Sequence, residues 1–364
     1  MKEFFNAEFA LNGLKVGYQD LSEVAYSLVK EGDPYEQEIG DFLLDWVSDR
    51  EDVRMRTSGS TGAPRVIRMP KNAMVHSALA TGEYLGLGEG TSALLCLPTR
   101  SIAGKMMLVR ALVLGWRLEL KPPDSNPLDG LLAPVDFAAM VPMQLEASLD
   151  KLDKISTILV GGAPLSKGLL ARIPEDGVSI YESYGMTETA SHIALRKLCR
   201  VPEGVAPESV LPPFRALPWV NISTDQRGCL SIQTSYLPEN PVVTNDLVTL
   251  ESDETFRWMG RIDHVVNSGG VKLIPEQLES KLSPLIPTPF FLTGMPDETL
   301  GEKLVLLVEG PRDDSLLQRI RESSALDRYE VPREVHFLEN FTHTPTGKIN
   351  RPKTLKALQK ESEQ

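Results

Sequence analysis

Cysteine is scarce in this sequence of 364 residues, which contains only three. Cys96, Cys199 and Cys229 are far apart and odd in number, and their spacing matches neither a disulfide framework nor a metal-binding motif. We therefore expect reduced thiols, in the core or near the surface.

Long apolar runs are also missing. The stretch from Met106 to Trp116 is interrupted by Arg110, which leaves it too short to cross a bilayer. Near the start, Glu3 and Glu8 stand where a signal peptide needs an unbroken apolar segment. We therefore expect a cytoplasmic protein without membrane insertion.

Basic charge is outnumbered, because 38 Lys and Arg residues face 50 Asp and Glu residues and give a net charge of -12. Such a surface is unsuited to nucleic acid or to anionic membranes. The length is sufficient for two domains. The composition is that of an ordinary globular protein and is compatible with a homo-oligomer.

Between about residues 50 and 185, strand-like runs alternate with helix-like runs. The buried-strand candidates are residues 94–97, 137–141 and 156–160, and an apolar run of helical length covers 104–114. This alternation predicts a mainly parallel sheet covered by helices. Ligands bind such sheets at the carboxyl ends of the strands.

The pattern changes after residue 218. Short alternating segments with turn residues predict antiparallel strands over 218–258. Beyond them we expect a helix from Pro275, strands near 290–292 and 304–308, and a helix over about 315–325. The predicted fold is α/β: a large N-terminal domain (1–260) with a mainly parallel sheet and an antiparallel β subdomain, and a small mobile α+β C-terminal domain (261–364).

Two motifs follow predicted strands. The first is rich in glycine and hydroxyl groups and consists of Thr57, Ser58, Gly59, Ser60, Thr61, Gly62, Ala63, Pro64 and Arg65. Backbone N–H groups of such a loop can approach a phosphate, although composition alone favours an ordinary surface turn. It is not a Walker A loop, because no Gly-Lys-Ser/Thr ends it.

The second motif is Tyr184-Gly185-Met186-Thr187-Glu188-Thr189, after a strand-like run at 178–181. A lone glutamate between threonines is usually only solvated. In a nucleotide site it could hold Mg²⁺ against phosphate oxygens.

Three further segments complete an ordered set: 161–165, 245–246 with 260–263, and 345–351. Together the five resemble the motifs of the adenylate-forming superfamily, which includes acyl- and aryl-CoA ligases, luciferases and the adenylation domains of peptide synthetases. The resemblance spans about residues 55 to 355. It implies an enzyme that activates a small-molecule carboxylic acid with ATP and Mg²⁺ and passes the acyl group to coenzyme A.

The resemblance also implies roles for single residues. Around the ATP phosphates it places Thr57, Ser58, Gly59, Ser60, Thr61, Gly62 and Arg65, where Arg65 replaces the usual lysine. Along the adenine it places Gly161, Gly162, Ala163, Tyr184, Gly185 and Met186, and at the ribose Asp246 and Arg261.

Three residues would act on the reacting atoms. The resemblance implies that Thr187 contacts the α-phosphate, Glu188 holds the Mg²⁺, and Lys348 bridges the substrate carboxylate and the α-phosphate. Carboxylate and phosphate repel each other, so catalysis rests on positioning and charge neutralisation. The alternative for Lys348 is an ordinary surface lysine.

The second half-reaction requires the C-terminal domain to swing, as the resemblance implies. Asp263 stands at the hinge position, and Ser268, Gly269 and Gly270 would move to the coenzyme A side. The alternatives are an ordinary turn aspartate and a plain glycine turn.

The acid is indicated by residues 97–104 and Arg110, which resemble the acyl-pocket segment of o-succinylbenzoate–CoA ligases of menaquinone biosynthesis. Ser101 stands where those enzymes usually carry histidine. Ser101, Lys105 and Arg110 are the acid-binding candidates, since a second carboxylate needs a cationic partner. For Arg110, ligand contact and extension to the surface are equally compatible with the sequence.

The phosphate loop starts nearer the N-terminus than is usual in the family. This departure favours a compact acid over a long fatty chain. The alternative functions are another aryl- or short-acyl-CoA ligase, an adenylation domain that feeds a carrier protein, and a non-enzymatic nucleotide-binding module. The joint presence of Glu188, Asp246 and Lys348 disfavours the last.

Overall fold

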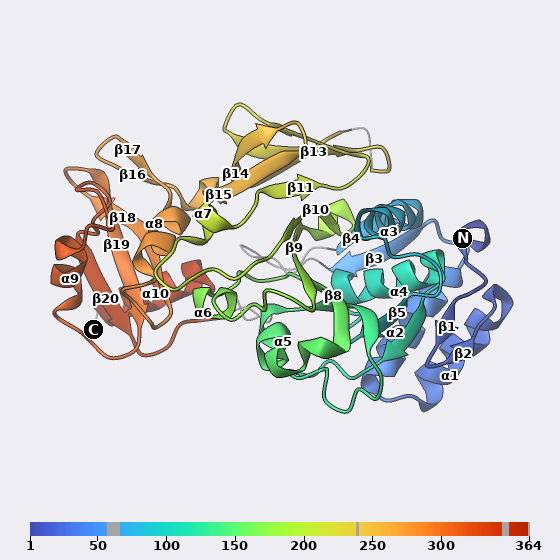
Figure 1. The fold of residues 1–364 in the computed structure, drawn as a ribbon. Helices are drawn as coiled ribbons and strands as arrows, with labels where there is room; N and C mark the ends of the chain where they lie inside the picture. Colours follow the sequence, from blue (N-terminus) through green and yellow to red (C-terminus); the bar gives the residue numbers. More distant parts are fainter. Residues whose placement is uncertain (57–65, 238–239, 344–348, 363–364) are drawn as a thin grey trace.

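The computed structural model describes residues 1–56, 66–237, 240–343 and 349–362, with side chains as far as Leu358. Within these ranges there are a 13-stranded sheet, a five-stranded sheet and a two-stranded hairpin. The 13-stranded sheet belongs to the first two thirds of the chain and the five-stranded sheet to the last third (Figure 1). None of the helices in these ranges is long and apolar enough to span a bilayer.

One half of the large sheet is parallel, in the order β9-β8-β7-β5-β6-β1, with β2 antiparallel at its edge. The strands are β1 (Ala10–Leu11), β2 (Leu14–Lys15), β5 (Ser92–Leu95), β6 (Arg117–Leu120), β7 (Val135–Met140), β8 (Ile155–Val160) and β9 (Ser179–Gly185). Leu94 and Leu95 point to opposite faces and join different hydrophobic clusters. A continuous apolar run is therefore favourable here, because both faces are covered.

The other half is antiparallel and continues from β9 through β10, β11, β15, β14 and β13 to β12. Its strands are β10 (His192–Lys197), β11 (Phe214–Ala216), β12 (Val220–Thr224), β13 (Cys229–Thr234), β14 (Val242–Ser252) and β15 (Thr255–Arg261). The predicted antiparallel strands are confirmed. They extend the parallel sheet rather than forming a sheet of their own, because β10 hydrogen-bonds to the free edge of β9.

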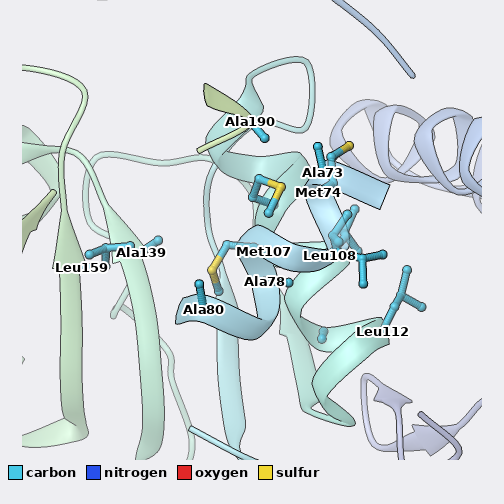
Figure 2. Close-up of a cluster of buried hydrophobic side chains, with 14 of the residues drawn as sticks. Ala73, Met74, Ala78, Ala80, Met107, Leu108, Leu112, Ala139, Leu159 and Ala190 are labelled. Carbon is cyan, nitrogen blue, oxygen red and sulfur yellow. The ribbon is translucent and has the colours of Figure 1, made fainter. Parts of the chain in front are cut away.

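Helices cover both faces of the parallel half. They are α1 (Leu21–Glu31), α2 (Pro34–Val47), α3 (Lys71–Leu85), α4 (Ile102–Leu114), α5 (Pro142–Ala147) and α6 (Lys167–Leu170), whereas the short helix α7 (Pro207–Val210) lies beside β15. The first four contribute to one buried cluster. Figure 2 shows the part of this cluster in which α3 and α4 face Ala139 of β7 and Leu159 of β8. Helix α4 begins after Ser101, whose hydroxyl accepts a hydrogen bond from the Gly104 amide.

Short elements complete this region. The 3-10 turns are η1 (Lys2–Phe4), η2 (Tyr18–Asp20), η3 (Leu149–Lys154), η4 (Thr187–Thr189) and η5 (Ile262–His264). The hairpin pairs β3 (Asp52–Arg56) with β4 (Val66–Pro70), and Arg56 lies opposite Val66. The strand predicted before the first glycine-rich motif is therefore confirmed, and residues 57–65 connect the two strands of the hairpin.

The last third has its own sheet, in the order β17-β16-β19-β18 with β20 parallel to β19. Its elements are β16 (Val266–Ser268), β17 (Val271–Leu273), α8 (Pro275–Leu282), β18 (Phe290–Asp297), β19 (Gly301–Glu309), α9 (Leu316–Glu322), β20 (Glu334–Leu338) and α10 (Arg351–Ser362). Two hydrophobic clusters lie wholly within it. Separate cores support the division that we propose into residues 1–260 and 261–364. The α/β fold class is as predicted.

Candidate active site

Three of the predicted nucleotide-binding residues meet where the ends of β9 and β15 lie beside Asp246, which is inside β14. The Tyr184 hydroxyl donates to Asp246 Oδ2 over 2.7 Å. Arg261 lies opposite Asp246 in the β14–β15 register, with Nη1 3.9 Å from Oδ1. Burial and the adjacent Asp246 carboxylate raise the pKa of Tyr184, so its hydroxyl stays protonated and donates.

Trp258 belongs to the same cluster, although no motif in the sequence marks it. Its indole Nε1–H donates to Asp246 Oδ1 over 3.2 Å. Both oxygens of Asp246 are therefore held, and its side chain is only 13% exposed. An anchored carboxylate of this kind is a suitable acceptor for the two hydroxyl groups of a ribose.

The predicted adenine loop starts directly after β8. A Cβ atom on Gly161 would lie 2.1 Å from the hydroxyl oxygen of Ser183 on the neighbouring strand β9. Gly162 has a φ of +85°, which L side chains rarely adopt. Both glycines are therefore required where the loop turns at the carboxyl edge of the sheet.

The second motif turns sharply at the end of β9. A Cβ atom on Gly185 would lie 2.3 Å from Cα of His192, so this glycine lets the chain fold back closely on itself. Thr187 and Glu188 form the 3-10 turn η4, and the Met186 amide donates to the Thr189 hydroxyl over 3.1 Å. The turn fixes the backbone on which Thr187 and Glu188 stand.

Glu188 is exposed and makes no ion pair with the described residues. No group of three or more His, Cys, Asp or Glu residues able to hold a metal occurs in the described part of the chain. A free carboxylate fits Mg²⁺ nevertheless, because this ion is commonly held by one or two carboxylates together with substrate phosphates.

Two predicted segments lie outside the described residues: the phosphate loop, with Thr57, Ser58, Gly59, Ser60, Thr61, Gly62 and Arg65, and the segment that carries Lys348. The described residues flank both of them. Arg56 and Val66 border the first, and His343 and Ile349 form a β-bridge beside the second.

The predicted hinge residue is held by the predicted ribose residue. Arg261 donates to both carboxylate oxygens of Asp263, each over 2.9 Å. Ser268 ends β16, and Gly269 and Gly270 form a two-residue turn to β17 with φ values of +60° and +85°. Positive φ at both positions is typical of a tight β-hairpin.

Arg110 is 1% exposed, so the alternative in which it reaches the surface is wrong. Its Nε–H donates to Thr81 over 3.3 Å, and its Nη2 lies 2.7 Å from the Ser191 hydroxyl and 3.3 Å from His192 Nδ1. None of the described residues offers it a carboxylate. Burial lowers the pKa of Arg110 to about 9, which leaves the guanidinium charged at neutral pH.

Comparisons with known proteins show the family to which the chain belongs. The family of AMP-binding enzymes matches residues 50–218. An AMP-forming acyl-CoA synthetase/AMP-acid ligase II-like protein from Dyadobacter fermentans is 37% identical, with 93% of this chain and 98% of that chain covered and a TM-score of 0.60. This chain belongs to the AMP-binding, adenylate-forming enzymes. Its activity is that of an acid–CoA ligase.

More distant relatives of the ligase have a named acid. The 2-succinylbenzoate–CoA ligase of Listeria monocytogenes is 27% identical over 91% of this chain and 74% of its own length. The o-succinylbenzoate coenzyme A synthetase of Bacillus subtilis, solved with ATP and a magnesium ion, is 21% identical with a TM-score of 0.69. That structure covers 95% of this chain and 84% of its own, and at this identity it shows the fold.

The structure does not bring the other two acid-binding candidates of the ligase next to Arg110. Lys105 places its ammonium 4.8 Å from the centre of the Phe42 ring, against helix α2, and burial lowers its pKa. Ser101 caps α4, and its hydroxyl donates to the Pro98 carbonyl over 2.7 Å.

The partners of Arg110 are the functional candidates that sequence reasoning missed. Thr81, Ser191 and His192 are all at least nine-tenths buried. Thr81 lies on α3, far from any motif. Ser191 and His192 follow the second motif after Ala190, and this nearness is the one signal that could have indicated them.

Proposed function

We propose that the ligase converts o-succinylbenzoate, ATP and coenzyme A into o-succinylbenzoyl-CoA, AMP and pyrophosphate, a step of menaquinone biosynthesis. Pyrophosphate leaves when the acyl-adenylate forms, and AMP leaves when the thiol of coenzyme A attacks this adenylate. The observation that carries the proposal is Arg110, a buried cation without a carboxylate partner among the described residues. The names of the relatives in Listeria and Bacillus support the same acid.

A buried charge such as that of Arg110 is costly. An arginine removed from water is normally paired, because the desolvation penalty is several kcal/mol per ion. Here only neutral acceptors hold it. A substrate with two carboxylates can present one to Arg110 while the other reacts. Thr81, Ser191 and His192 take up the hydrogens on Nε and Nη2, so the second carboxylate of the acid would approach Nη1.

The nucleotide would bind at the carboxyl edge of the large sheet. Asp246, held by Tyr184 and Trp258, accepts hydrogen bonds from the ribose hydroxyls. The loop of Gly161, Gly162 and Ala163 would line the adenine with Tyr184, Gly185 and Met186, and residues 57–65 would bind the phosphates. These groups fix ATP so that its α-phosphate lies near Thr187.

Adenylation is then chiefly a matter of charge. Mg²⁺, held by Glu188 and phosphate oxygens, would neutralise part of the negative charge on the phosphates. Lys348 would bridge the acid carboxylate and the α-phosphate, which would let the two anions approach in line. Thioester formation follows after a swing about Asp263 that brings Ser268, Gly269 and Gly270 to the coenzyme A side.

The test is mass-spectrometric detection of the acyl-CoA formed by the purified protein with ATP, Mg²⁺ and coenzyme A. A panel of acids includes o-succinylbenzoate, its analogues that lack one carboxylate, benzoate and short aliphatic acids. We expect o-succinylbenzoyl-CoA with the highest kcat/KM. A higher kcat/KM for another acid, acyl-AMP that is not passed to coenzyme A, or no adenylate at all would contradict the proposal and identify which alternative holds.

A further inference from the structure

The protons around Arg110 can be assigned from the hydrogen-bond pattern. The Thr81 hydroxyl donates its hydrogen to the Ser77 carbonyl over 2.8 Å. Thr81 Oγ1 therefore accepts at its contact with His192 Nε2, 3.2 Å away, and Nε2 carries the imidazole proton. His192 Nδ1 is then an acceptor, facing Nη2 of Arg110 at 3.3 Å and the Ser191 hydroxyl at 3.2 Å.

This tautomer holds the guanidinium from one side. Its Nε–H ends on Thr81, and its Nη2 hydrogens end on Ser191 and His192. Among the described residues, no acceptor is found for Nη1, which is left for a ligand. Burial and the adjacent Arg110 lower the pKa of His192 well below its ordinary value, so the imidazole is neutral.

The neutrality of these acceptors matters for binding. An aspartate in place of His192 would hold Arg110 equally well, but it would also cancel the charge that attracts a ligand carboxylate. Neutral acceptors orient the guanidinium and leave its charge uncompensated. The cluster is therefore built to hold a cation whose counter-ion arrives with the substrate.

The backbone joins this cluster to the nucleotide site. His192 pairs with Gly185 in the β9–β10 register, and the closeness of their backbones excludes a side chain at Gly185. The position of the imidazole is therefore fixed relative to the turn that carries Thr187 and Glu188. A single rigid unit sets the distance from Arg110 to the reacting centre.

We infer that His192, supported by Thr81, is a positioning residue that determines specificity for acids with a second carboxylate, because it orients Arg110 without neutralising it. The inference rests on the proposed function. It adds His192 to the specificity-determining residues and explains the selectivity by the neutral charge of this acceptor.

The decisive variants are His192→Asn and His192→Asp, which have nearly the same shape and differ in charge. Asparagine can place its oxygen near the position of Nδ1 and act as a neutral acceptor, whereas aspartate supplies a competing carboxylate. The measured quantity is the ratio of kcat/KM for o-succinylbenzoate to kcat/KM for the analogue that lacks the non-reacting carboxylate.

We expect His192→Asn to keep this ratio within about threefold of the wild type and His192→Asp to lower it about 100-fold, while KM for ATP stays within about threefold in both. His192→Leu, which has no acceptor, lowers the ratio about tenfold. Far-UV circular dichroism and thermal melting identify any variant that does not fold.

Equal ratios for His192→Asn and His192→Asp in folded protein would overturn the inference. If His192→Asp fails to fold, the comparison of His192→Leu with His192→Asn decides, and equal ratios there overturn it likewise. Failure of the proposed function is distinguishable, because the wild-type protein would then not use o-succinylbenzoate at all.

Discussion

Two mostly buried arginines in this ligase have opposite surroundings. Arg351, at the start of α10, lies 2.7 Å from Glu279 and 3.7 Å from Glu276, and its side chain is 20% exposed. Arg110, on α4, is 1% exposed and has only Thr81, Ser191 and His192 as partners among the described residues. The first arginine is compensated by the protein itself, and the second is not.

A buried cation with a structural role has a carboxylate partner in the protein, whereas a buried cation that binds a ligand lacks one. Arg351 also donates to the Leu292 carbonyl over 3.3 Å, so it ties α10 to α8 and β18. Removing it would leave the Glu279 carboxylate, which is only 15% exposed, without a cation. Removing Arg110 would leave only neutral groups behind. The change should therefore weaken substrate binding more than it lowers the free energy of unfolding.

A third cation, Lys348, sharpens this comparison, because we propose that it meets the reacting carboxylate rather than the distant one. Lys348→Ala should lower the rate of adenylate formation about 1000-fold and leave ATP affinity nearly unchanged. Pyrophosphate release and nucleotide binding by calorimetry measure the two quantities. Turnover near the wild-type rate would show that the assigned role is wrong.

The two arginines should also differ in stability when each is replaced by methionine. Arg351→Met should lower the free energy of unfolding by about 3 kcal/mol, because it leaves the mostly buried Glu279 without its cation, whereas Glu276 keeps His264. Arg110→Met should change it by no more than about 1 kcal/mol, since losing a desolvated charge offsets the lost hydrogen bonds. Urea denaturation of both variants gives the values, and the reverse order would break the comparison.

The pH dependence of stability tests the surroundings of His192, whose only charged neighbour among the described residues is Arg110. Its pKa is lowered in the folded state, so below about pH 6.5 the unfolded chain binds a proton that the folded chain does not. The stability that the neutral His192 contributes is fully present above that pH. It is lost as the pH falls, by at most about 1.4 kcal/mol for each pH unit. His192→Asn should show a shallower decline in urea denaturation between about pH 7 and pH 5.5. Identical slopes would mean that His192 titrates normally.

The smallest expected effect concerns the nucleotide side. Tyr184→Phe removes the hydrogen bond to Asp246, while Trp258 still holds the other oxygen. KM for ATP should rise about fivefold, with kcat for o-succinylbenzoate within about twofold of the wild type. An unchanged KM for ATP would remove Tyr184 from the positioning of Asp246.

Much of the fold could be predicted from local pattern. The apolar run at 94–97 indicated a buried strand, and β5 is covered on both faces as such a run requires. The proline at 275 begins α8, and the 104–114 run lies within α4. The joining of the antiparallel strands to the parallel sheet was missed, because edge pairing between β9 and β10 leaves no sequence signature.

The candidate site also has one part that the sequence predicts and one part that it does not. Tyr184, Asp246 and Arg261 belong to motifs, and the structure brings them together. The surroundings of Arg110 could not be foreseen, because His192 is 82 positions away and Thr81 lies on another helix. Whether an arginine on an apolar helix is paired depends on such distant contacts. The sequence alone therefore does not decide between ligand contact and extension to the surface for Arg110.

The most direct test of the account measures the coupling between Arg110 and the second carboxylate of the acid. The kcat/KM of the wild type and of Arg110→Met is determined for o-succinylbenzoate and for the analogue that lacks the non-reacting carboxylate. We predict that the wild type prefers the dicarboxylate about 100-fold and that Arg110→Met shows almost no preference. The same preference in both proteins would mean that Arg110 does not meet the substrate, and would contradict the account.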